Sequence, residues 1–194
     1  MTKSIDFYFD FISPYSYIAH KKISEINKDN NIIINYKGIL LGGLHKLAGI
    51  TAPFFLNTKA KFMIRDCKMI AKKFNYNFTF NSNFPINSLQ LMRGTLILDD
   101  ELKKFYIDRV FEAYWGDGLN LADEIVFNKL LLDLNIDKIF FYNKIKEKKI
   151  KEKLKKCTYD ALDKGVFGAP TYIVNKKIFW GQDRLEYALD EYNK

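Results

Sequence analysis

Residues 5–17 read IDFYFDFISPYSY, and this stretch decides the N-terminal part of the fold. The segment Ile5–Ile12 is rich in β-forming residues and has only two polar positions, so it predicts a mostly buried strand. A helical pattern then runs from Ser13-Pro14 to about Lys28. Proline suits the first turn of a helix because its φ is already fixed and its missing N–H needs no partner there. The junction therefore predicts a strand that leads directly into a helix N-terminus.

Outward from that junction, the remaining strand patterns lie near the two ends of the chain. Ile32–Lys37 predicts a second strand, which completes a β-α-β unit with the preceding helix. Thr171–Val174 and Lys177–Trp180 predict a β-hairpin that turns at Asn175-Lys176. A closing helix is predicted over Gln182–Tyr192.

The middle of the chain shows almost no strand pattern and is typical of helices. Five segments have helix-like apolar spacing: Lys59–Asn75, Asn87–Leu98, Asp100–Gly116, Leu121–Leu134 and Asp137–Lys156. We therefore predict an α/β protein with a thioredoxin-like fold, formed by residues 1–57 and 157–194. Residues 58–156 form a large all-helical insertion in this prediction.

Composition limits the class of protein. The 194 residues are 48% hydrophobic and 16% aromatic, enough for a substantial core. No segment approaches the roughly 18 uninterrupted apolar residues of a membrane span, and MTKSIDFYFDF lacks the features of a signal peptide. We therefore expect a cytoplasmic protein without a membrane partner. Cys67 and Cys157 form no CxxC motif and read as ordinary thiols, and His20 and His45 are too isolated to predict a metal site.

The net charge of +8 raises the question of nucleic-acid binding. Much of the excess lies in residues 144–156, KIKEKKIKEKLKK, where glutamates interrupt the lysines. Ile145, Ile150 and Leu154 supply the start of an apolar stripe along the same segment. A helix with one solvated face explains this run, so no nucleic-acid partner is expected.

Ser13 stands at the predicted helix N-terminus, where backbone N–H groups and the helix dipole favour an anion. Its hydroxyl has two interpretations. It can cap the helix, which is the common role of serine at this position, or it can donate a hydrogen bond to a bound thiolate. The junction alone leaves both open.

Two further segments, both near the C-terminus, are candidates for ligand binding. Residues 165–172, GVFGAPTY, place Pro170 directly before a strand. A trans bond is the default there, whereas a cis bond would turn the backbone of Ala169 outward to pair with an extended peptide such as glutathione. In the second segment, Asp183 follows a strand and a glycine. It either accepts a ligand ammonium group or complements the dipole of the last helix.

Three spaced motifs together resemble a known family: DFISPYSY at 10–17, GVFGAPTYIV at 165–174 and FWGQDRLE at 179–186. They resemble the signatures of 2-hydroxychromene-2-carboxylate isomerases and the related kappa-class glutathione transferases, in the DsbA-like branch of the thioredoxin superfamily. The resemblance covers nearly the whole chain in the right order. It implies a glutathione-dependent cis-trans isomerase whose small aromatic substrate is attacked reversibly by the glutathione thiolate.

The resemblance leaves two alternatives to the isomerase. They are a kappa-class-like transferase or peroxidase acting on an electrophilic substrate, and a non-catalytic glutathione-binding protein. A homodimer is compatible with all three functions. A dithiol oxidoreductase is disfavoured, because Ser13 and Ser16 replace both cysteines of the redox motif.

The resemblance also implies roles for individual residues. Ser13 is the catalytic residue that hydrogen-bonds the glutathione sulfur. The implied glutathione contacts are Ser13, Pro14, Tyr15, Ala169, Pro170, Trp180, Gly181, Gln182 and Asp183. The implied substrate contacts are Lys46, Thr51, Asn87 and Arg93.

One position departs from the family pattern. The family usually reads Gly-Asn-Gln-Pro-Pro where this chain reads GITAP at residues 49–53. Ile50 thus replaces the asparagine that helps to hold glutathione and substrate, and Thr51 is the nearest polar side chain. We expect weak isomerase activity as a consequence, because an apolar side chain cannot make the amide hydrogen bonds.

Overall fold

A four-stranded mixed sheet forms the centre of the computed structural model, which describes residues 3–29 and 32–194. Its strands are β1 (Ile5–Phe9), β2 (Ile34–Gly38), β3 (Thr171–Val174) and β4 (Lys177–Trp180), in the order β2-β1-β3-β4. β1 runs parallel to β2 and antiparallel to β3, and β3 pairs antiparallel with β4. The turn between β3 and β4 has positive φ at Asn175 and Lys176, as the predicted hairpin requires.

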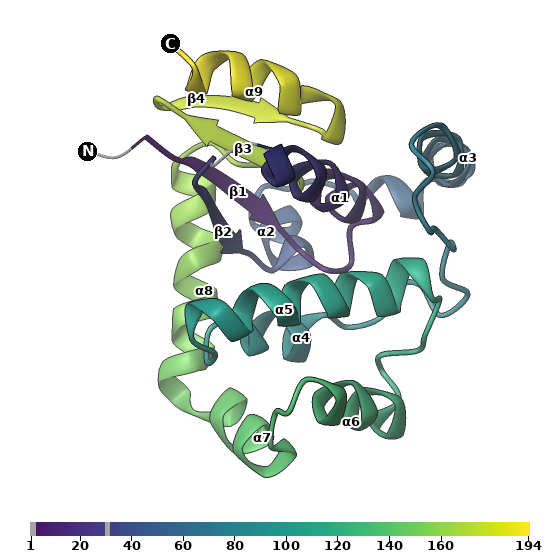
Figure 1. Ribbon diagram of the computed structural model, residues 1–194, viewed down its shortest axis with the longest axis vertical. Coiled ribbons are helices and arrows are strands. Elements are labelled where there is room, and N and C mark those ends of the chain that lie inside the picture. Colours follow the sequence, from purple (N-terminus) through teal and green to yellow (C-terminus); the bar gives the residue numbers. More distant parts are fainter. Residues whose placement is uncertain (1–2, 30–31) are drawn as a thin grey trace.

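Helices surround the sheet and fill the chain between β2 and β3. They are α1 (Pro14–Asp29), α2 (Leu41–Leu47), α3 (Asn57–Lys73), α4 (Leu89–Gly94), α5 (Asp100–Phe111), α6 (Glu124–Asp133), α7 (Lys138–Lys146), α8 (Lys148–Asp163) and α9 (Leu185–Tyr192). Shorter turns are η1 (Pro53–Phe55), the π-helical η2 (Glu112–Gly116) and η3 (Gln182–Arg184). Figure 1 shows α4–α7 gathered below the sheet and α8 running from them back up to it.

The first strand is shorter than predicted. It ends at Phe9 rather than Ile12, because the chain turns at Asp10. The Asp10 carboxylate accepts the Ile12 N–H at 3.1 Å, and its backbone carbonyl accepts the Ser13 N–H at 3.0 Å. Aspartate commonly makes such local bonds and thereby closes a turn.

One helical prediction also needs correction. The segment predicted as one helix over Asp137–Lys156 is two helices, because Glu147 has extended backbone angles, φ −57° and ψ 136°. The second of them, α8, continues to Asp163 and so crosses the predicted domain boundary between residues 156 and 157. The short helix α2 has no counterpart in the prediction.

Aromatic packing ties the helical region to the strand end that leads into α1. The Phe11 ring lies 4.9 Å from that of Phe111 on α5, and both side chains are fully buried. The Trp115 indole N–H donates to the Phe11 carbonyl at 2.8 Å. These contacts fix the chain just before Ser13.

In the described part of the chain, no helix is long and apolar enough to cross a membrane.

Candidate active site

A cavity of about 880 Å³ opens beside the N-terminus of α1. This volume lies within the range of pockets for small molecules. Its wall is largely apolar and aromatic, and includes Phe54, Phe55, Phe62, Phe84 and Phe167. Seven of the predicted site residues also line it: Ser13, Pro14, Tyr15, Thr51, Asn87, Ala169 and Trp180.

Ser13 lies at the edge of this cavity, and its hydroxyl both accepts and donates a hydrogen bond. The side chain is only 5% exposed. Its oxygen accepts the Ser16 N–H at 3.1 Å, which is the bond of an N-cap, and donates to the Ala169 carbonyl at 3.0 Å. The capping role is therefore present. To donate to a thiolate, the hydroxyl has to turn its proton away from Ala169.

The Ala169–Pro170 bond is cis, as the peptide-pairing interpretation requires. Ala169 lines the cavity directly beside Ser13, since the two residues share a hydrogen bond. Gly168, next to it, leaves room for Trp180, because a Cβ there would come within 2.6 Å of the indole nitrogen in its present position. This close approach lets Trp180 pack against Phe167, with ring centres 4.9 Å apart, and form one end of the cavity.

Three further residues predicted to contact glutathione lie beyond Trp180, outside the cavity wall. Gly181 has φ +114° and donates its N–H to the Pro170 carbonyl at 3.0 Å. The Gln182 side chain accepts from Lys22 of α1 at 2.7 Å. Asp183 is exposed, and its carboxylate pairs with Arg184 at 2.8 Å. Of the three, only the Asp183 carboxylate faces solvent.

The predicted substrate residues separate into two groups. Thr51 and Asn87 line the cavity, whereas Lys46 and Arg93 are not among its lining residues. Two basic side chains absent from the prediction, Lys59 and His45, line it instead. Burial lowers the pKa of His45, so Lys59 is the cation of this wall at neutral pH.

The departure from the family pattern at Ile50 lies within this site. Ile50 lines the cavity and is 36% exposed. Ala52, Pro53 and Phe54 of the same loop also line the cavity, so the loop presents a largely apolar surface in which Thr51 is the polar side chain. The asparagine of the family pattern would instead place an amide group in this segment of the wall.

Asp10 was not predicted as a site residue, although its carboxylate makes hydrogen bonds to three residues of the cavity wall. Its side chain is fully buried. One carboxylate oxygen accepts the Ile12 N–H at 3.1 Å, the other accepts the Leu41 N–H at 2.8 Å, and the Ser88 side chain is a third partner. Ile12, Leu41 and Ser88 all line the cavity. The sequence did contain a signal, namely an acidic residue within an otherwise apolar strand.

Burial raises the pKa of the Asp10 carboxyl to about 6, because the three hydrogen bonds only partly offset the cost of removing the charge from water. Burial likewise raises the pKa of the Tyr15 phenol, which donates to Asp66 of α3 at 2.9 Å. Tyr15 therefore stays neutral and ties α1 to α3 across one side of the cavity.

Known proteins resemble this chain over almost its whole length. A family model described as a DSBA-like thioredoxin domain matches residues 4–193. The 2-hydroxychromene-2-carboxylate isomerase of Sphingobium xenophagum is 30% identical over 189 residues, which is 96% of each protein. Glutathione S-transferase kappa 1 of Caenorhabditis elegans is 27% identical over 204 residues, covering 96% of this chain and 89% of that protein. A solved structure of 2-hydroxychromene-2-carboxylate isomerase has a TM-score of 0.89 and 27% identity, and the match covers 97% of this chain and 94% of that one.

These similarities confirm the predicted thioredoxin-like fold with its helical insertion. They leave the division at residues 57 and 156 as a prediction, and the same holds for the role of each site residue.

Proposed function

The chain belongs to the 2-hydroxychromene-2-carboxylate isomerase and kappa-class glutathione transferase family of DSBA-like thioredoxin domains, and within it we propose a glutathione-dependent isomerase. The observation that carries the proposal is the placement of the Ser13 hydroxyl. It lies at a helix N-terminus, beside the Ala169 backbone, on the edge of a large apolar cavity. The substrate is a small aromatic molecule with an isomerisable double bond.

The residues present fit glutathione at its sulfur. A thiol of ordinary pKa, about 8.5, is only a few per cent ionised at neutral pH. The N-terminus of α1 favours a negative charge beside Ser13, and the hydroxyl can supply a direct hydrogen bond. Ala169 offers backbone groups to the middle of the tripeptide, and the exposed Asp183 offers an acceptor to its ammonium end.

In the proposed mechanism, glutathione held by Ser13 and Ala169 would supply a thiolate nucleophile for the substrate double bond, and the thiolate would leave again when that double bond is restored in its rotated geometry. The chain contributes placement and electrostatics. Ser13 turns its hydroxyl from the Ala169 carbonyl toward the sulfur and holds the charge there. The apolar wall excludes water and orients the aromatic ring against the thiolate. No redox step is required.

A transferase or peroxidase acting with the same thiolate is the second candidate, favoured by the apolar surface at Ile50. Titration with glutathione, followed by assays on 2-hydroxychromene-2-carboxylate, an aromatic halide and an organic hydroperoxide, separates the candidates. The proposal requires saturable glutathione binding and isomerisation that depends on glutathione. Conjugation or peroxide reduction without isomerisation would replace it with the second candidate. Binding without any turnover would indicate a non-catalytic protein.

Ile50→Asn is expected to raise isomerase activity several-fold, because it restores an amide to the cavity wall. Each hydrogen bond to a polar ligand is worth about 1 kcal/mol, or about fivefold in affinity. Glutathione affinity by calorimetry and kcat/KM on the isomerase substrate measure the gain. Ile50→Leu is the matched apolar control. If Ile50→Asn and Ile50→Leu behave alike, Ile50 is a neutral replacement.

Lys59→Gln is expected to raise KM for a carboxylate-bearing substrate about tenfold and to change kcat little. The reason is that Lys59 lines the cavity, whereas the predicted substrate contacts Lys46 and Arg93 do not. Lys61→Gln is the matched control, since Lys61 is exposed on the same helix but does not line the cavity. Equal KM values for the two variants would show that Lys59 does not bind the substrate.

A further inference from the structure

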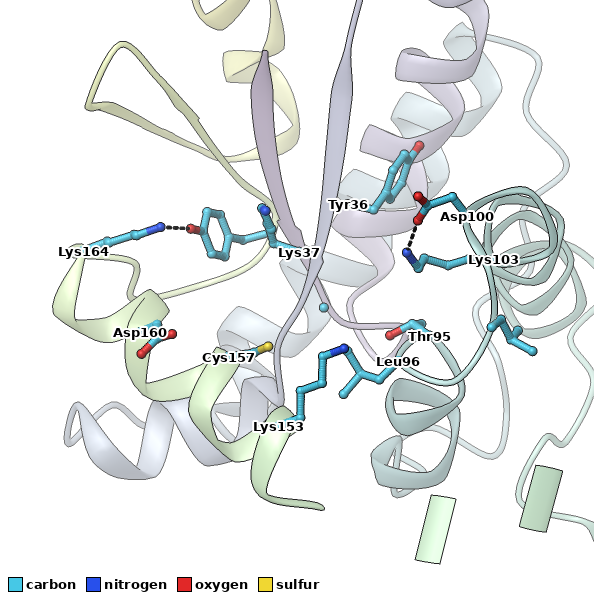
Figure 2. Close-up of a pocket in the computed structure, with 13 residues that line it drawn as sticks. Tyr36, Lys37, Thr95, Leu96, Asp100, Lys103, Lys153, Cys157, Asp160 and Lys164 are labelled. Atoms are coloured by element: carbon cyan, nitrogen blue, oxygen red, sulfur yellow. Dashed lines mark hydrogen bonds and ion pairs between the residues drawn. The ribbon is translucent and has the colours of Figure 1, made fainter. Parts of the chain in front are cut away.

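A second cavity of about 510 Å³ lies at the β2 edge of the sheet and shares no lining residue with the first. Its walls come from β1, the edge strand β2, the segment after α4, the start of α5 and α8. Figure 2 shows this arrangement, with Lys153, Cys157 and Lys164 along α8 and its C-terminal end, and Lys37 on the strand opposite.

Lysines dominate the charge of this cavity. Lys37, Lys103, Lys153 and Lys164 line it against only two carboxylates, Asp100 and Asp160. Both carboxylates are already paired. Asp100 accepts from Lys103 at 2.7 Å, and Asp160 accepts from a lysine outside the cavity, Lys156, at 2.7 Å.

Among the described residues, none of the other three lysines has a carboxylate within hydrogen-bond distance. Lys153 has no ion pair or hydrogen bond within the described residues. Lys164 donates only to the neutral Tyr8 hydroxyl, at 3.3 Å, and Lys37 reaches Asp6 only at 3.8 Å. Burial raises the pKa of the Cys157 thiol, so this thiol adds no negative charge.

Tyr8 adds a specific donor at the sheet side of the cavity. Its side chain is only 4% exposed, and burial raises the pKa of its phenol, so it stays protonated at neutral pH. The oxygen accepts from Lys164, which leaves the phenol proton free to donate to a ligand.

The spacing of residues along α8 explains how this largely exposed helix also lines the second cavity. Lys153, Cys157 and Asp160 follow one another at i, i+4 and i+7, which places them on one face of the helix. Lys151 and Lys155 are exposed and do not line the cavity. Only one face of the basic run therefore takes part.

We propose that this second cavity binds a small molecule with several negatively charged oxygen groups, held by Lys37, Lys153, Lys164 and Tyr8. The lysines converge on one cavity from a strand and a helix, which suits a small polyanion better than a nucleic-acid backbone. Lys153 and Lys164 are eleven residues apart, about 16 Å along a helix axis, and both line the same cavity. A ligand with more than one negative group, such as a polyphosphate or a polycarboxylate, therefore suits this site better than a single anion.

Inorganic tripolyphosphate is the probe, with citrate as the carboxylate counterpart, and binding is followed by calorimetry with the full chain at low and moderate salt. We expect saturable binding that weakens with salt, and about tenfold loss in Lys153→Gln and in Lys164→Gln. Tyr8→Phe is expected to lose about threefold. A preference for tripolyphosphate over citrate would identify phosphate groups as the recognised chemistry, and the reverse would identify carboxylates.

Lys151→Gln is the matched control, because it removes the same charge from another face of α8 and is expected to change affinity less than about twofold. Equal losses in Lys151→Gln and Lys153→Gln would assign the binding to the general basic surface and overturn the site. Absence of saturable binding by either probe would overturn it as well. These readouts do not involve glutathione, so they are independent of the proposed isomerase function.

Discussion

Ser13→Ala is expected to lower glutathione-dependent turnover about 10- to 100-fold. A hydrogen bond to a charged group is worth about 1.5–3 kcal/mol, and the thiolate is the charged group of the proposed reaction. The same variant loses the cap of α1, which costs about 1 kcal/mol of folding stability. Turnover at a temperature where both proteins are folded, together with the ultraviolet absorbance of bound thiolate, measures the first effect apart from the second.

Two control variants separate donation to the sulfur from capping. Ser13→Thr keeps the hydroxyl and should retain most of the activity. Ser16→Ala removes a buried hydroxyl from the same helical turn, and that hydroxyl has no hydrogen-bond partner in the described chain. It should therefore leave turnover and thiolate absorbance unchanged. If Ser13→Ala retains wild-type turnover with bound thiolate, Ser13 is only a helix cap.

The sequence predicted the sheet and most of the helices because those elements carry local patterns. β1, β3 and β4 combine β-forming residues with turn residues at their ends, and α3 and α8 have regular apolar spacing. The errors arose where side chains override the pattern. Asp10 ends β1 early by accepting the Ile12 N–H, although Phe11 and Ile12 continue the apolar run.

The cavity wall was harder to predict than the junction between β1 and α1. Ser13 and Ala169 are 156 positions apart, yet recognisable motifs surround both of them. Lys59 lies in no such motif, and only the packing of α3 brings it to the cavity. Lys46 and Lys59 are chemically alike, so residue type alone could not choose between them.

The helical region positions the site as well as covering it. Trp115 holds the Phe11 carbonyl, and Asp10 next to it holds the Leu41 and Ile12 N–H groups. The strand end before Ser13 is therefore fixed from two directions. The buried Asp10 carboxyl therefore lies directly behind the cavity wall, and its ionisation should make the folding stability depend on pH.

Asp10→Asn is expected to abolish a pH-dependent part of the folding stability. The carboxyl pKa is about 6 in the folded chain against an ordinary value of 3.8, a difference worth about 3 kcal/mol. Because the folded state binds the proton more tightly, this contribution is fully present below about pH 4. It is lost as the pH rises through 6, where the buried group ionises.

Urea unfolding of wild type and Asp10→Asn at several pH values between 4 and 7 measures this effect, since other titrating groups cancel in the difference. Wild type should lose most of this difference, about 2.4 kcal/mol, relative to the variant across that range. The variant should also turn over more slowly at neutral pH, because an amide can accept only one of the two N–H groups that the carboxylate holds. A stability difference that is constant with pH would show that Asp10 ionises as it does in the unfolded chain. Full activity in Asp10→Asn would show that the Leu41 and Ile12 segments keep their places without this carboxylate.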